Sequence, residues 1–192
     1  CLWGAGQAGA VNPDSFTLSV TIGNQLSVNV ENDAGTDVTT YDFGSMNLGS
    51  VSVNTGVIDI DNNSGGLTET FQLSIGDTGG GLSLRQTTGA LAINEYRVHA
   101  LFQDAAPSHV AFSSTTATNM LTTTAQTAAA AGGAFAAAGV PAAEDGLSVL
   151  DDSRLAGGTG SEVRLWLMLQ LAATSGFSGT QTAFATVYVN AQ

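Results

Sequence analysis

Hydrophobic and polar residues alternate along much of this chain with the period of two that is typical of β-strands. In residues 16–22 and 26–30, apolar side chains alternate with hydroxyl and amide side chains. Gly23 and Asn24 separate the two runs, which predicts either a hairpin or one long strand with a bulge. Further short strands are predicted at 51–53, 57–60, 71–75, 82–84, 91–93 and 95–102.

Segments rich in glycine, asparagine or alanine interrupt the alternation. Asp61–Gly66 and Gly76–Gly81 have the composition of turns. Residues 105–146 are rich in Ala and Thr, but they show no apolar stripe, and a double glycine breaks the helix that alanine favours. We expect an extended excursion with at most one short helix, and long excursions are usually functional or interfacial.

Two segments near the C-terminus, 163–171 and 182–190, are apolar on both faces and need cover on both sides. Together with the earlier strands they give about eight to ten strands separated by frequent turns. The predicted fold class is therefore an all-β antiparallel β-sandwich, jelly-roll or immunoglobulin-like. We expect a single β-sandwich domain over residues 12–192, with residues 1–11 as an N-terminal extension.

Charge narrows the classes of function. The 192 residues include 16 acids and 4 cations, all of them scattered arginines, for a net charge of −12. Nucleic-acid binding needs clustered cations to neutralise phosphates, so it is excluded. Charged residues make up only 10% of the chain, and a surface of hydroxyls and amides is typical of an extracellular protein. No apolar run is long enough for a membrane-spanning helix.

The only cysteine, Cys1, excludes an internal disulfide framework. Its position is that of the processed cysteine of a bacterial lipoprotein, so Cys1 is the predicted lipidation site. An alternative interpretation takes Ala8–Ala10 as the small-residue end of a signal peptide, which would make Val11 the mature start.

The arm formed by residues 1–11 carries Leu2 and Trp3 among alanines and glycines. Such a segment has no obvious place in a compact domain. We expect it to be lipidated, donated to a neighbouring subunit, or both. In the second case Leu2, Trp3 and Val11 lie at the subunit interface.

One segment spells the opening of a calcium loop, with Asp59, Asp61 and Asn63 as candidate ligands. Ser64 stands where such a loop requires glycine, and Thr70 stands where it requires an acid. A hairpin turn made of turn-forming residues is the better interpretation. No metal site and no cofactor are therefore predicted.

Nothing in the chain predicts an enzyme. The two histidines, His99 and His109, are too few for a zinc site and are interpreted as structural. A nucleophile elbow of the form G-x-S-x-G with its partners is missing. Aromatic residues could form a sugar-binding platform, although aromatics in strands are more often core; they are Trp3, Tyr41, Tyr96, Trp166 and Tyr188.

Four segments carry a resemblance to secreted bacterial surface proteins. They are Tyr41–Ser50, with its Phe-Gly and Gly-Ser pairs, Leu67–Ser74, Glu95–Phe102 and the closing strand Thr182–Asn190. The pattern is distantly similar to TasA/camelysin-like fibre subunits. The resemblance implies a jelly-roll-like sandwich secreted for structural use, which in some relatives polymerises by strand exchange.

Two functions remain open. The first is a structural subunit of an extracellular filament (a pilus-like fibre) or surface layer, which self-associates into a homopolymer by non-covalent strand exchange. Low surface charge favours it, because strong charge would repel identical neighbours. The alternative is a monomeric lipid-anchored adhesion or carbohydrate-binding module on the cell surface.

Overall fold

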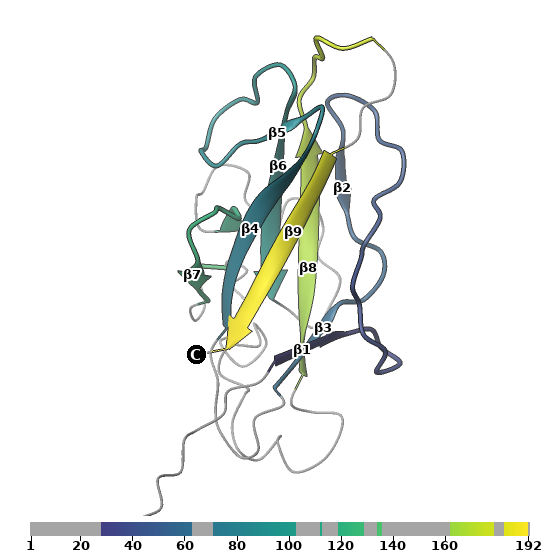
Figure 1. The fold of residues 1–192 in the computed structure, drawn as a ribbon, viewed down its shortest axis with the longest axis vertical. Coiled ribbons are helices and arrows are strands. Elements are labelled where there is room, and N and C mark those ends of the chain that lie inside the picture. The colour runs from purple at the N-terminus through teal and green to yellow at the C-terminus, as the bar shows by residue number, and fades with distance from the viewer. Residues whose placement is uncertain are drawn as a thin grey trace, which may run out of the picture.

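The computed structural model describes residues 28–62, 71–102, 112, 119–128, 134–135, 162–178 and 183–191 (Figure 1). This part of the chain contains strands, turns and loops but no α-helix, so the predicted all-β class is confirmed. The strands are β1 (Val28–Glu31), β2 (Val51–Val53), β3 (Asp59–Asn62), β4 (Phe71–Gly80), β5 (Ser83–Leu84), β6 (Glu95–Phe102), β7 (Gln126–Thr127), β8 (Glu162–Leu171) and β9 (Ala183–Ala191).

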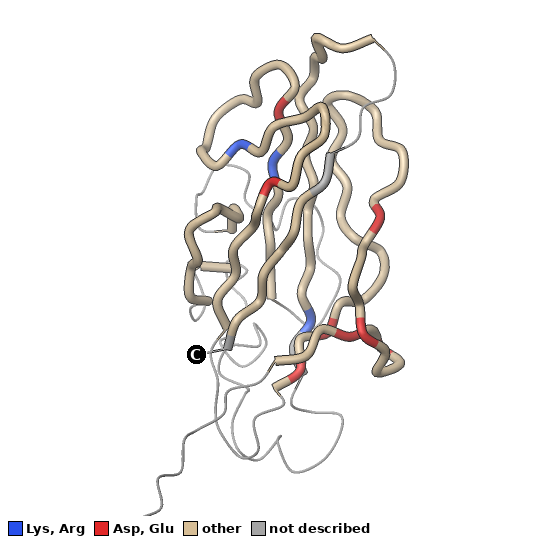
Figure 2. The backbone as a smooth tube through the Cα atoms, in the orientation of Figure 1, with Lys and Arg blue, Asp and Glu red and all other residues tan. Residues whose placement is uncertain are grey.

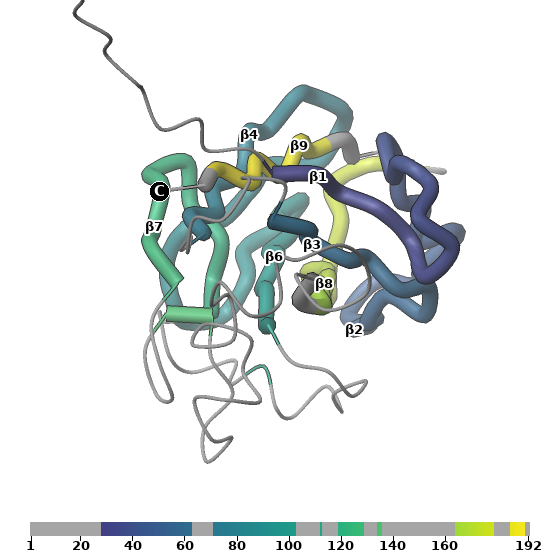
Figure 3. Tube along the Cα trace, turned by 90° about the horizontal axis from the view of Figure 1, so that it is seen from below, coloured from purple at the N-terminus to yellow at the C-terminus, as the bar shows by residue number. Residues whose placement is uncertain are grey.

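The strands form two sheets that face each other (Figure 3). The larger sheet has the order β1-β3-β8-β6-β5, and β2 also pairs with β8. The smaller sheet has the order β7-β4-β9. All of these pairs are antiparallel except β5 with β6.

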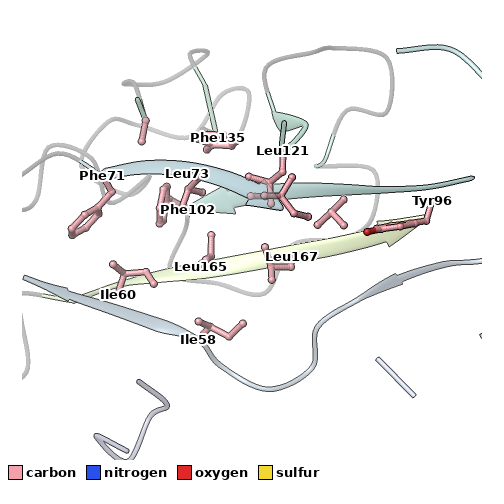
Figure 4. Close-up of a cluster of buried hydrophobic side chains, with 14 residues drawn as sticks. Ile58, Ile60, Phe71, Leu73, Tyr96, Phe102, Leu121, Phe135, Leu165 and Leu167 are labelled. Carbon is pink, nitrogen blue, oxygen red and sulfur yellow. The ribbon is translucent and has the colours of Figure 1, made fainter. Parts of the chain in front are cut away.

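The core lies between the sheets because alternate residues of each strand point inward. Figure 4 shows Leu165 and Leu167 of β8 pointing toward Leu73 of β4. From β6, Phe102 joins Phe71 of β4, with ring centroids 6.1 Å apart. All five side chains are buried, which explains the alternation seen in the sequence.

A second apolar cluster lies on the opposite face of the larger sheet. It consists of Leu101 from β6, Trp166 and Met168 from β8, and Phe112. The central strands β6 and β8 are therefore buried on both faces. This confirms the prediction that 163–171 is apolar on both sides because both sides are covered.

Residues 119–128 connect the two sheets. The N–H of Leu121 donates to the carbonyl of Val98 in the larger sheet (2.9 Å), and the carbonyl of the next residue, Thr122, accepts from Ile75 in the smaller sheet (2.9 Å). This part of the predicted 105–146 excursion is thus integrated into both sheets. The apolar side chain of Leu121 is fully buried, which accounts for its place in the core.

Two local predictions were wrong. Gly76–Gly81 is not a turn, because β4 continues to Gly80 and pairs with β9 through an irregularity between Asp77 and Gly79. Gly79 and Gly80 absorb the irregularity with φ values of 112° and 116°, which only glycine adopts readily.

Residues 91–93 form no strand either. The loop from 85 to 94 is instead fixed by polar contacts, in which the Arg97 guanidinium donates to the Gly89 carbonyl (2.6 Å) and the Glu95 carboxylate accepts from the Ala92 N–H (2.7 Å). Ile93 is therefore left 59% exposed.

Candidate functional site

The open edge of β9 is the first candidate site. Within the described residues, this nine-residue strand pairs only with β4. The N–H of Ile75 in β4 donates to Thr122, on the side of β4 away from β9. In antiparallel strands both backbone polar groups of a residue point to one side, so those of Val187, the partner of Ile75, point to the open edge. By alternation the backbone groups of Val189 do the same.

The two faces of β9 differ. Val187 and Val189 point inward and pack against the core, where they are half-buried. Tyr188 points outward, is 48% exposed and lies over Gly76, where an added Cβ would be 3.3 Å from the tyrosine ring. The prediction that 182–190 forms a strand is confirmed, but its outer face has no cover from the described residues.

The larger sheet also keeps core-facing apolar side chains that are only partly covered. Val28 and Val30 of β1, and Leu169 and Leu171 at the end of β8, are half-buried against the core. The smaller sheet has three strands against six in the larger one, so its strands do not cover the whole inner face. An additional strand beside β9 would extend the smaller sheet over this face.

The strand β9 itself carries no charged residue. Figure 2 shows no acid or arginine along β9, whereas acids gather near β1 and β3. There Arg164 of β8 binds Asp33 (2.9 Å) and lies 3.5 Å from the buried Asp59. Charged side chains on an edge strand usually prevent it from pairing with another chain, and β9 lacks this protection.

The calcium candidates are placed as follows. Asp59 and Asp61 lie on β3, which pairs with β1 on one side and with β8 on the other. This extended backbone differs from the curled loop that surrounds calcium, and it forms because Ile58 and Ile60 are buried in the core. Asn63 lies outside the described residues. Among the described residues, no group of three or more His, Cys, Asp or Glu is arranged to hold a metal ion.

The predicted lipidation and interface residues, Cys1, Leu2, Trp3 and Val11, lie outside the described residues, as does His109. The described aromatic residues do not form one platform. Tyr96 is in the core and Trp166 in the second apolar cluster, whereas Tyr41 contacts Phe43 edge to face at 5.0 Å. Among the described tyrosines and tryptophan, Tyr188 is the exposed one.

A second candidate site, the buried polar cluster, was missed by sequence reasoning. It consists of Arg97 and His99 on β6 and Gln170 on β8. Arg97 is directly opposite Gln170, and His99 is opposite Met168, on the face of the larger sheet away from the core. The detectable signal was the pattern of β6, in which Glu95, Arg97 and His99 occupy alternate positions between apolar residues.

Several polar atoms of this cluster have no hydrogen-bond partner among the described residues. Arg97 and His99 are 2% and 1% exposed. Within the described part of the chain nothing pairs with Arg97 Nε, with either ring nitrogen of His99 or with Gln170 Oε1. Burial, together with the nearby Arg97 charge, lowers the pKa of His99 to about 4, so the ring is neutral at pH 7. Burial also lowers the pKa of Arg97.

Comparison with protein-family models and with curated proteins finds no match to this chain. The described residues include no helix that could cross a membrane.

Proposed function

We propose that this chain is a structural subunit of an extracellular filament or surface layer, which polymerises by non-covalent strand exchange between copies. The observation that carries the proposal is the uncharged β9 edge, which pairs with no strand other than β4 among the described residues, beside a larger sheet whose core-facing side chains are partly exposed. In this proposal the two sheets are an antiparallel sandwich of the jelly-roll or immunoglobulin-like class. The chain has no catalytic role in it.

The β9 edge has the properties of a strand acceptor. The N–H and C=O groups that point away from β4 have no partner among the described residues, and they can pair with a strand from another copy, as in β-augmentation. The inward side chains of Val187 and Val189 already belong to the core, so an added strand continues an existing apolar layer. Neither a charge nor a proline on β9 opposes the approach of this strand.

The donor in this proposal is the arm of residues 1–11. Its Leu2 and Trp3 can enter the apolar layer, and burying each contributes roughly 1.5–3 kcal/mol. Its small residues allow close approach to the acceptor strand. Ordering the arm costs about 1–2 kcal/mol per residue, so the backbone hydrogen bonds to β9 are needed as well as the side-chain burial.

Substitution of Val187 by proline tests the acceptor edge. Proline removes an N–H that points away from β4, so the pairing of β4 with β9 is retained. We expect the wild-type protein to form filaments by negative-stain microscopy and Val187→Pro to be a folded monomer by light scattering. Val187→Ala is the matched control, because it shortens the side chain but keeps the N–H, and it should still assemble.

Deletion of residues 1–11 tests the donor separately, and it should give a folded monomer. If the deleted protein still assembles while Val187→Pro does not, the edge is correct and the donor is another segment. Filaments of Val187→Pro that match the wild type would overturn the acceptor assignment. A wild-type protein that stays monomeric at high concentration would contradict polymerisation and favour a monomeric surface module.

A further inference from the structure

The charge balance of the buried polar cluster needs explanation. Arg97 carries a charged guanidinium that is almost completely buried, and buried charges are normally paired. One of its N–H groups donates to the Gly89 carbonyl (2.6 Å), but within the described residues no carboxylate lies within ion-pair distance. Glu95, on the same face of β6, binds Arg85 instead (2.9 Å) and accepts from Ala92 (2.7 Å).

The neighbouring groups have complementary hydrogen-bonding capacity. A neutral histidine offers one donor and one acceptor, and an amide side chain offers both. His99 is two residues from Arg97 on the same face of β6, and Gln170 is directly opposite Arg97. Within the described residues, a cation without a carboxylate partner and an imidazole without a hydrogen bond therefore lie beside the Gln170 amide.

This arrangement also extends toward solvent. A row of side chains crosses the sheet from Val51 on β2 through Gln170 on β8 to Arg97 on β6. Val51 is 40% exposed, Gln170 is half-buried and Arg97 is buried. Among the described residues, the exposed end of this row is therefore at β2 and the buried end is at Arg97.

We propose that the buried polar cluster is a binding site for a small oxyanion. Arg97 Nε–H and a His99 N–H donate to the oxygens of the anion, and the amide group of Gln170 completes the shell. The anion supplies the negative charge that Arg97 lacks within the described residues. The site is independent of filament assembly, because it lies on β6 and β8 rather than on β9.

The experiment measures the response of the purified, dialysed protein to acetate and, separately, to phosphate. Ionic strength is kept constant with chloride. Binding to the folded state raises the melting temperature with the logarithm of anion concentration. It also raises the pKa of His99, which is observed by NMR and assigned with His109→Gln. A response to acetate alone identifies a carboxylate ligand, and a response to phosphate identifies a tetrahedral oxyanion.

Arg97→Gln should abolish both responses. Arg164→Gln is the matched control, because it removes the same charge at the distant acidic end of the sheet (Figure 2) and should respond as the wild type does. If Arg97→Gln does not fold, the His99 signal of the wild-type protein still decides. Unchanged His99 resonances and an unchanged melting temperature with both anions would mean that water fills the site, and the proposal would be wrong. An Arg97→Gln response equal to the wild-type response would also overturn it.

Discussion

Lowering the pH from 7 to 4 is expected to destabilise the protein through His99. The imidazole is buried on the outer face of β6, with no hydrogen-bond partner for either nitrogen among the described residues. The groups around it include the positive charge of Arg97 on the same strand and the uncharged Met168 and Gln170 on β8, with Met120 on its other side. Protonation therefore places a second charge in a site that does not stabilise it.

The magnitude follows from the difference between two pKa values of His99. The ordinary pKa of histidine, taken for the unfolded chain, is 6.5, and the pKa in the folded protein is about 4. One pKa unit corresponds to about 1.4 kcal/mol. The full difference therefore corresponds to about 3 kcal/mol of stability. Because the folded value is the lower one, the unfolded chain takes up the proton first. The contribution of neutral His99 is complete above pH 6.5, decreases as the pH falls to 4, and is lost below it.

Urea denaturation at pH 7, 6, 5 and 4 measures this effect, with tryptophan fluorescence as the signal. The comparison variant is His99→Met, which matches its neighbours Met168 and Met120 and does not titrate. The acidic residues titrate similarly in both proteins, so their contribution cancels. Between pH 7 and 4, the wild type should lose about 3 kcal/mol more than His99→Met. The buffers contain no carboxylate or phosphate, so that no oxyanion occupies the buried polar cluster.

Equal pH dependence in the wild type and in His99→Met would refute this reasoning. It would mean that the imidazole is hydrated or acquires a partner in solution. His109→Gln is the control for histidine in general and should retain the wild-type pH dependence. If His109→Gln loses the pH dependence instead, the titrating residue is His109 and not His99.

Three further outcomes are expected. Asn54→Ala should lower the free energy of unfolding, measured by urea denaturation, by about 1–3 kcal/mol. The substitution removes Asn54 Oδ1, which accepts from the buried N–H of Leu167 at 2.7 Å. An unchanged free energy of unfolding would show that water replaces the amide. Gly79→Ala should lower the free energy of unfolding by about 1–3 kcal/mol, because alanine is strained at the φ of 112° that Gly79 adopts, although nothing lies within 4 Å of the added Cβ. An unchanged free energy of unfolding would mean that the backbone relaxes. Adding EDTA or calcium should leave the melting temperature unchanged, because Asp59 and Asp61 lie on a paired strand, whereas a calcium-dependent increase would restore the metal site.

Strand positions were predictable where one face is apolar and the other is polar. Residues 71–75 and 95–102 alternate because their inward side chains enter the core, and both segments are strands in the structure. The glycines between 76 and 81 misled the prediction, because glycine suits a turn and a strand irregularity equally well. Only the pairing of β4 with β9 distinguishes the two, and this pairing joins residues far apart in the sequence.

The candidate sites depend on the same long-range information. The sequence indicated that 182–190 is a strand, but the open side of β9 follows from which strand lies beside it. Arg97 and His99 could be placed on one face of β6 by alternation alone. The proximity of Gln170 depends on the register between β6 and β8, which local patterns do not determine.

The two consecutive residues that connect the sheets have a mechanical consequence. The N–H of Leu121 is hydrogen-bonded to β6, and the carbonyl of the next residue, Thr122, to β4. Sliding one sheet past the other would have to break at least one of these bonds and withdraw the buried Leu121 side chain. A pull on one sheet is therefore shared with the other at this point, and the amide protons of Leu121 and Ile75 should exchange with solvent together rather than separately.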